Sequence, residues 1–222
     1  GIPRQLDWPR VRKLLTIGVF GALLHLTGDL ILGWGVEDES LTGLFRMLSA
    51  YTATSDGGIL ASVLLGLFGM TLEGLSFFGV YRLMAERSPK DAHRYRSGIL
   101  GYLIFGACGF HVPTCALVFL ARQGLPEETL VKFALYFLLP ATALFWVFFL
   151  LLAVTQIAAF AKGYTPYPGW CWVFSPLVGG LAAQALGFLG NLPALNAIAC
   201  AWLAIGCLWM FGGLLCLCGK AR

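Results

Sequence analysis

The chain has 222 residues, of which 59% are hydrophobic and only 12% are charged. An ordinary soluble domain carries roughly 25% charged residues, and the mean hydropathy here is +0.80. This composition excludes a water-soluble globular protein. The net charge of +4 does not indicate a nucleic-acid-binding surface, because the basic residues lie at the borders of apolar runs. We expect one all-α integral membrane domain covering residues 1–222.

Six apolar segments predict a polytopic bundle of six transmembrane helices. They cover residues 11–34, 57–82, 97–121, 130–161, 176–192 and 194–218. The first segment follows basic residues, as in a signal peptide, but its length favours a retained span. The fourth is too long for one straight crossing, so we expect it to tilt, to kink at Pro140 or to project from the bilayer.

The distribution of basic residues predicts that both termini lie in the cytoplasm (N-in/C-in). With the N-terminus inside, only Arg46, Arg122 and Lys132 of the 15 basic residues fall on the outer side. This bias agrees with the positive-inside rule. We therefore expect a multi-pass protein of the cell membrane, in a bacterium the inner (plasma) membrane.

The outer segment, residues 35–56, has apolar residues at helical spacing. Leu41, Leu44, Phe45 and Leu48 recur at i, i+3, i+4 and i+7. This pattern predicts a short interfacial helix within residues 41–50 that lies over the bundle. A packed loop without a helix is the alternative.

Four ionisable residues lie inside the predicted spans: His25, Asp29, Glu73 and His111. Such groups are costly in hydrocarbon unless they face a cavity or one another. At about 1.5 Å per residue from the outer ends, Asp29 lies roughly 7 Å deep, His25 roughly 13 Å and His111 roughly 15 Å. By the same count Glu73 lies roughly 24 Å deep, past the midplane.

These four residues are the candidate catalytic groups. His25 and Asp29 are four residues apart and so share one helix face. A carboxylate in that position can fix the tautomer of the imidazole and raise its basicity. The alternative is that these groups only hold helices together through hydrogen bonds.

A second set of polar residues is expected to line a cavity that opens outward. The candidate ligand-binding residues are Asp56, Thr114, Gln184, Asn191 and Asn196. Thr114 shares a helix face with His111, and Asn196 shares one with Cys200. For Gln184 and Asn196 a hydrogen bond between helices is the alternative role, and for Asn191 a turn before Pro193.

Two short motifs resemble an uncharacterised family of small bacterial polytopic membrane proteins. Gly28-Asp29-Leu30 stands near the end of the first span, and Gly79-Val80-Tyr81-Arg82 at the end of the second. The resemblance implies a membrane helix bundle and implies no activity.

Three functions remain open at this point. The first is an intramembrane acid/base enzyme for a lipid or other apolar small molecule, in which Asp29 orients His25 and in which His111 and Glu73 assist. The second is a proton-coupled small-molecule transporter whose proton path runs from Asp56 past these four residues. The third is a non-catalytic accessory or binding protein that makes its contacts through residues 35–56.

No cofactor is expected. Two imidazoles and two carboxylates are a suitable ligand set for zinc or iron, but the greater predicted depth of Glu73 disfavours a metal site. The expected partners are membrane lipids and an apolar or lipid-like small molecule, with no nucleic acid. A homo-oligomer is left open.

Overall fold

The computed structural model describes residues 5–221, and every regular element in this part of the chain is helical. The ends of the predicted domain, residues 1–4 and 222, lie outside the described residues. Within residues 5–221, five helices are long and apolar enough to cross a membrane. The chain is therefore a multi-pass membrane protein of all-α fold.

The long helices are α1 (Trp8–Gly33), α3 (Asp56–Ala85), α4 continued by α5 (Pro89–Phe105 and Val112–Arg122), α6 continued by α7 (Glu127–Phe133 and Leu139–Ala161), and α10 (Trp202–Leu217). The short helices are α2 (Gly43–Ser49), α8 (Pro176–Gly187) and α9 (Pro193–Cys200).

The last third of the chain differs most from the predicted spans. Helix α8 has 12 residues, a length of about 18 Å, whereas the fifth predicted span covers residues 176–192. It ends at Gly187, and the chain then reaches Pro193, which begins the next helix; the residue before this proline, Leu192, is extended (φ −119°, ψ 147°). The sixth predicted span, residues 194–218, is divided at Ala201 into α9 and α10.

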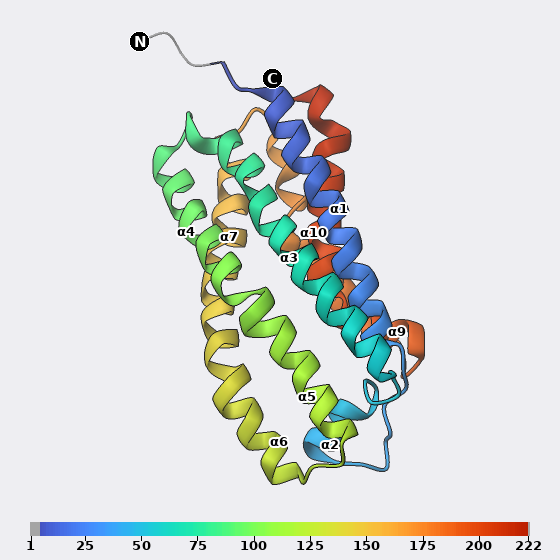
Figure 1. The fold of residues 1–222 in the computed structure, drawn as a ribbon. Coiled ribbons are helices and arrows are strands. Elements are labelled where there is room, and N and C mark those ends of the chain that lie inside the picture. The colour runs from blue at the N-terminus through green and yellow to red at the C-terminus, as the bar shows by residue number, and fades with distance from the viewer. Residues whose placement is uncertain (1–4, 222) are drawn as a thin grey trace.

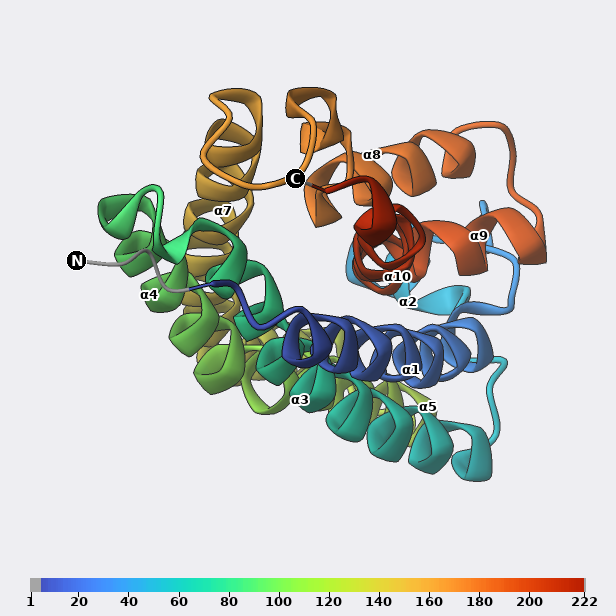
Figure 2. The same cartoon turned by 90° about the horizontal axis from the view of Figure 1, so that it is seen from above.

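The long helices form a curved row that is seen from above in Figure 2. Helix α10 packs on α1, α1 on α3, α3 on α4 and α4 on α7, while α8 packs on the other side of α10. Helix α1 begins and α10 ends at one end of the bundle, which we call the terminal end (Figure 1). The opposite end carries residues 35–56 and is called the loop end (Figure 1).

Helices α1 and α3 touch backbone to backbone because glycines face each other across their interface. A Cβ atom on Gly69 would lie 2.6 Å from both the Gly21 carbonyl oxygen and the His25 nitrogen. A Cβ on Gly28 would lie 3.2 Å from the carbonyl oxygen of Ser62. Small residues allow this close approach in membrane bundles, and it brings the side chains of α1 directly against those of α3.

Two of the long helices contain a wide π turn, each ending two residues before a proline. The π turn Ala107–His111 joins α4 to α5 and precedes Pro113, and Ala134–Leu138 joins α6 to α7 and precedes Pro140. Proline has no N–H to donate, and its ring crowds the carbonyl group four residues earlier. The helix relieves this crowding by widening one turn. Pro140 thus stands at an irregular turn of the long fourth helix.

Segment 35–56 is bound to the helix ends around it at the loop end. The Thr54 hydroxyl donates to the Leu32 carbonyl oxygen at the end of α1 (3.0 Å). Arg122 Nη1 donates to the Thr52 carbonyl oxygen (2.7 Å), and Glu127 Oε1 accepts from the backbone N–H of Leu44 at the start of α2 (3.2 Å). The segment with the predicted interfacial helix therefore contains a real short helix, α2, which is held against α5 and α6.

The α1–α3 contact predicts that Gly69→Ala destabilises the protein. The added methyl group would have to push apart two backbones that are in contact, and overpacking of this kind costs about 1–3 kcal/mol. We expect the thermal unfolding midpoint in detergent to fall by several degrees. Gly57→Ala, on the same helix, is the matched control, because its Cβ would meet only the Ser55 hydroxyl at 3.9 Å. An equal effect of both substitutions would contradict the packing argument.

Candidate functional site

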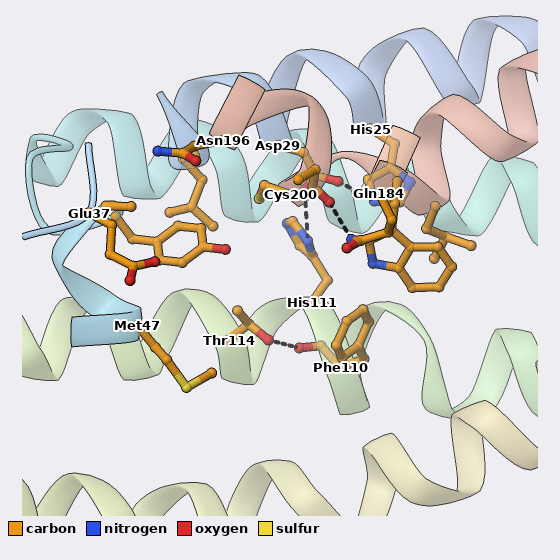
Figure 3. Close-up of a pocket in the computed structure, with 17 residues that line it drawn as sticks. His25, Asp29, Glu37, Met47, Phe110, His111, Thr114, Gln184, Asn196 and Cys200 are labelled. Atoms are coloured by element: carbon orange, nitrogen blue, oxygen red, sulfur yellow. Dashed lines mark hydrogen bonds and ion pairs between the residues drawn. The ribbon is translucent and has the colours of Figure 1, made fainter. Parts of the chain in front are cut away.

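A cavity of about 400 Å³ lies at the loop end, between α1, segment 35–56, the start of α5, α8 and the α9–α10 pair. Figure 3 shows its lining side chains. Part of the wall is apolar and is formed by Leu32, Met47, Phe110, Trp202 and Leu203. The polar part contains His25, Asp29 and His111, which are buried at 2%, 5% and 5% exposure. The cavity thus has room for a small molecule with both a polar and an apolar portion.

The first pair of the site is the one predicted from its spacing. His25 and Asp29 lie one turn apart on α1, and His25 Nε2 is 3.1 Å from Asp29 Oδ2. The other ring nitrogen of His25, Nδ1, is 2.8 Å and 3.2 Å from the two carboxylate oxygens of Glu73. The imidazole therefore lies between two carboxylates, one at the cavity and one behind it.

Glu73 is fully buried and has a second partner. The Tyr102 hydroxyl donates to Glu73 Oε2 at 2.5 Å. Because the carboxylate accepts from Tyr102 on one side, we assign it as an acceptor from His25 Nδ1–H as well. Glu73 thereby fixes both the orientation and the tautomer of the His25 ring.

The contact between Glu73 and His25 shows that the predicted difference in depth does not keep the two side chains apart. The backbone of Glu73 is indeed deeper, level with Gly21, since a Cβ on Gly21 would lie 3.1 Å from Glu73 N. However, helical side chains lean toward the N-terminus of their own helix. Helices α1 and α3 are antiparallel, so Glu73 leans toward the loop end and His25 toward the terminal end. The two side chains meet in the middle.

His111 reaches the same place from the π turn that joins α4 to α5. Its Nε2 is 2.7 Å from the backbone carbonyl oxygen of Ser62. A carbonyl group only accepts, so Nε2 carries the proton. In the neutral ring Nδ1 is then a bare acceptor, and it lies 3.6 Å from Asp29 Oδ1. The His25 and His111 rings are edge to face, with centroids 5.7 Å apart.

The His111 ring can occupy its position against α3 only because residue 66 is a glycine and has no side chain. A Cβ on Gly66 would lie 2.0 Å from His111 Nε2. Cys115 lies one turn further along α5. Its Sγ is 3.7 Å from His111 Nε2 and 3.7 Å from the Ser62 hydroxyl oxygen. Helix α3 thus presents a hollow, formed by Ser62 and Gly66, into which the imidazole fits.

Three of the predicted ligand-binding residues line the cavity. Thr114, Gln184 and Asn196 come from α5, α8 and α9. The Thr114 hydroxyl donates to the Phe110 carbonyl oxygen of its own helix (2.6 Å). Gln184 Nε2 donates to the Ala199 carbonyl oxygen (2.7 Å), which joins α8 to α9. Each of these side chains keeps an oxygen available to a bound molecule.

Asn191 and Asn196 hold the start of segment 35–56. Asn191 accepts from the Glu37 backbone N–H (2.9 Å) and donates to its carbonyl oxygen (2.7 Å). Asn196 donates to the Gly35 carbonyl oxygen (2.9 Å) and to Asn191 Oδ1 (2.8 Å). Asn191 does not line the cavity. Its role in the structure is to hold the backbone at Glu37, at the start of segment 35–56.

Asp56 lies away from the site. It stands in the first turn of α3, and its Oδ1 is 3.4 Å from Nε of Arg122, an exposed ion pair. It does not line the cavity. The predicted series that begins at Asp56 is therefore interrupted before it reaches Asp29.

Sequence reasoning missed Tyr51 and Tyr102. Tyr51 belongs to segment 35–56 and lines the cavity; interaction with Cys200, together with burial, raises the pKa of its phenol, so the hydroxyl stays protonated. Tyr102 is a fully buried partner of Glu73. Tyrosines are common at membrane borders and in packed cores, and their positions in the sequence give no sign of these contacts.

The hydrogen bonds predict the tautomers of both site histidines. We expect ¹⁵N NMR of imidazole-labelled protein to show a proton on Nε2 of His111 and on Nδ1 of His25. The chain has three histidines. The signals that are lost in His93→Gln belong to His93, so the signals that remain belong to the two site histidines. A His111 protonated only at Nδ1 would contradict the bond to Ser62.

Comparison with known proteins gives a family without an assigned activity. No curated protein and no solved structure matches the chain significantly. One family model matches residues 4–221, which includes α1 to α10 and every residue of the site. The chain belongs to this family of unknown function, DUF6796.

Proposed function

We propose that the protein is an intramembrane enzyme that carries out acid/base chemistry on a lipid or other apolar small molecule. Its site is the cavity at the loop end, which in this proposal opens to the outer side of the membrane. The observation that carries the proposal is the convergence of His25, Asp29 and His111 on one buried wall of that cavity. The apolar wall opposite suits the hydrocarbon part of such a molecule.

The proposal includes six spans with both termini in the cytoplasm. Helix α1 begins and α10 ends at the same end of the bundle (Figure 1), which supports an even number of crossings. Helix α8 supplies the fifth crossing together with residues 188–192, and α9 with α10 supplies the sixth. The basic residues Arg82, Arg87 and Lys162 lie near the terminal end and support its cytoplasmic position.

The orientation predicts opposite labelling of two introduced cysteines. We expect Ser40→Cys, at the loop end, to react with a membrane-impermeant maleimide in intact cells. Lys162→Cys, which follows α7 at the terminal end, should react only after permeabilisation. The unsubstituted chain is the control for its native cysteines. The reverse pattern would overturn the orientation, and labelling of both sites in intact cells would overturn the three crossings that lie between the two positions (α3, α4–α5 and α6–α7).

The arrangement supplies the parts that proton transfer requires. His25 Nδ1 is held by Glu73, so Nε2 is the nitrogen directed to Asp29 and the cavity. His111 Nδ1 approaches the same carboxylate from the other side. A proton taken up at either imidazole is thus held next to a bound molecule, and the protonated ring nitrogen then donates to the Asp29 carboxylate. Thr114 and Gln184 are placed to orient the polar group of that molecule.

A transporter is less well supported, because the apolar ring of Phe77 interrupts the polar series beyond Glu73 and Tyr102. The next contact of Glu73 is Tyr102, and beyond it lies the ring of Phe77, with centroids 5.0 Å from Tyr102 and 6.4 Å from Tyr95. Tyr95 and Gln156 form their own hydrogen bond (3.0 Å) on the far side of Phe77. All five side chains along this line are almost completely buried: Glu73, Tyr102, Phe77, Tyr95 and Gln156. The described residues therefore form a local site at one end of the bundle.

The enzyme proposal predicts that Asp29→Asn abolishes a lipid conversion that the wild type performs. Purified protein in nanodiscs would be incubated with a total membrane lipid extract of its host, and the products followed by mass spectrometry. General acid/base groups contribute about 100-fold or more to a rate, and we expect a loss of that size. Asp56→Asn is the matched control, because it makes the same chemical change outside the cavity.

Two results would contradict the enzyme. In the first, mass spectrometry finds no change in the lipid extract after incubation with folded wild-type protein under any condition. The other is a proton flux into proteoliposomes that depends on an imposed gradient and disappears in Glu73→Gln, a result that would establish the transporter instead.

A further inference from the structure

The donor atoms of His25, Asp29 and His111 lie as close together as the ligands of one metal ion. One donor atom from each residue lies within 4.8 Å of the others. His25 Nε2 is 3.1 Å from Asp29 Oδ2, and His111 Nδ1 is 3.6 Å from Asp29 Oδ1. Ligands about 2.1 Å from a tetrahedral zinc ion lie about 3.4 Å from one another. Only small side-chain movements would place a metal among these three groups.

In metal-binding histidines, the ring nitrogen that does not face the metal usually donates a hydrogen bond to a fixed acceptor, and both imidazoles here have such an acceptor. His25 donates through Nδ1 to the Glu73 carboxylate, and His111 donates through Nε2 to the Ser62 carbonyl oxygen. Such partners fix the tautomer and leave the other nitrogen free to bind a metal. Tyr102 in turn holds Glu73. The nitrogens left free are the two that face Asp29.

The charge of the cluster also favours a divalent cation. Asp29 and Glu73 are buried carboxylates, and neither has a lysine or arginine partner among the described residues. With both imidazoles neutral, the cluster has a charge of −2. A divalent cation cancels this charge, whereas one added proton leaves −1, which is costly in a medium of low dielectric constant.

The cavity leaves one side of the cluster open. Three protein ligands and one open position are typical of catalytic zinc sites, whereas structural zinc sites are closed by four protein ligands. Thr114, Gln184 and Cys200 line the cavity beside the cluster. A substrate oxygen or a water molecule can therefore reach a metal from this side.

We propose that His25 Nε2, the Asp29 carboxylate and His111 Nδ1 bind a divalent first-row transition metal, zinc or ferrous iron, with an open coordination position toward the cavity. Two imidazoles and one carboxylate suit both ions. This inference rests on the proposed function, since it names the cofactor of the same site. A metal there would polarise a carbonyl or phosphoryl oxygen of the bound molecule.

The test is direct metal binding by the full chain in detergent. Protein stripped with a chelator would be titrated with zinc chloride, and with ferrous iron under anaerobic conditions, and metal content would be measured by mass spectrometry. We expect about one ion per chain and a higher thermal unfolding midpoint in the loaded protein. Absence of stoichiometric binding of either ion to folded wild type overturns the proposal.

Variants test whether the ion binds at this site. Asp29→Asn and His111→Gln should lose stoichiometric binding, while Asp56→Asn and His93→Gln should keep it. Glu73→Gln, which changes only the partner of a ligand, should weaken zinc binding by about 10- to 100-fold. Cobalt(II) absorption spectra offer a second readout, since the visible bands should change in Glu73→Gln. Unchanged binding in folded Asp29→Asn and His111→Gln would overturn the assignment.

The two proposals can fail separately. A lipid conversion that needs Asp29 but persists after complete removal of metal would overturn the metal site and leave the acid/base enzyme standing. One ion bound through Asp29 and His111 in a protein that converts no lipid would establish the metal site and overturn the enzyme.

Discussion

An ionisable side chain inside a membrane bundle needs a partner within the protein, because the surrounding hydrocarbon does not solvate it. Here four such groups satisfy one another: Glu73, His25, Asp29 and His111 form one connected series. Their contact depends on the glycines between α1 and α3, which allow the two backbones to touch. Without that approach, Glu73 would keep only Tyr102 as a partner and His25 would keep only Asp29 on its own helix. Close helix packing and the polar site are thus one structural requirement.

Much of the architecture could be predicted from composition and hydrophobic pattern. Four long helices coincide with predicted spans, and the i, i+4 spacing correctly placed His25 and Asp29 together. The fifth and sixth spans were less predictable, because the apolar pattern continues through Leu192 and Ala201 while the backbone does not remain helical. Hydropathy reports where a chain avoids water. It carries little information on where a helix breaks within an apolar run.

The site residues were predicted less well, because a count of helical rise places only the backbone and does not say where each side chain points. Glu73 was expected to lie apart from His25 because a count of backbone rise ignores the lean of side chains, which in antiparallel helices brings two residues together. Asp56 was grouped with the site by its position along the membrane, whereas it binds Arg122 at the surface of the bundle. Asn191 acts on the backbone of Glu37. Such partners are set by tertiary contacts, which are absent from a single sequence.

The π turn before α5 makes the position of one member of the site, His111, separable from the packing of α1 on α3. A π turn holds one residue more than an α-helical turn, and one residue corresponds to a rotation of about 100° around the helix axis. A chain that lacked this extra residue would still cross the membrane with the same helices. Its third long helix, however, would turn a different face to α3, and the imidazole of His111 would no longer meet Asp29. The loss of a single codon would therefore remove the contact between His111 and Asp29 while leaving the architecture of the bundle in place.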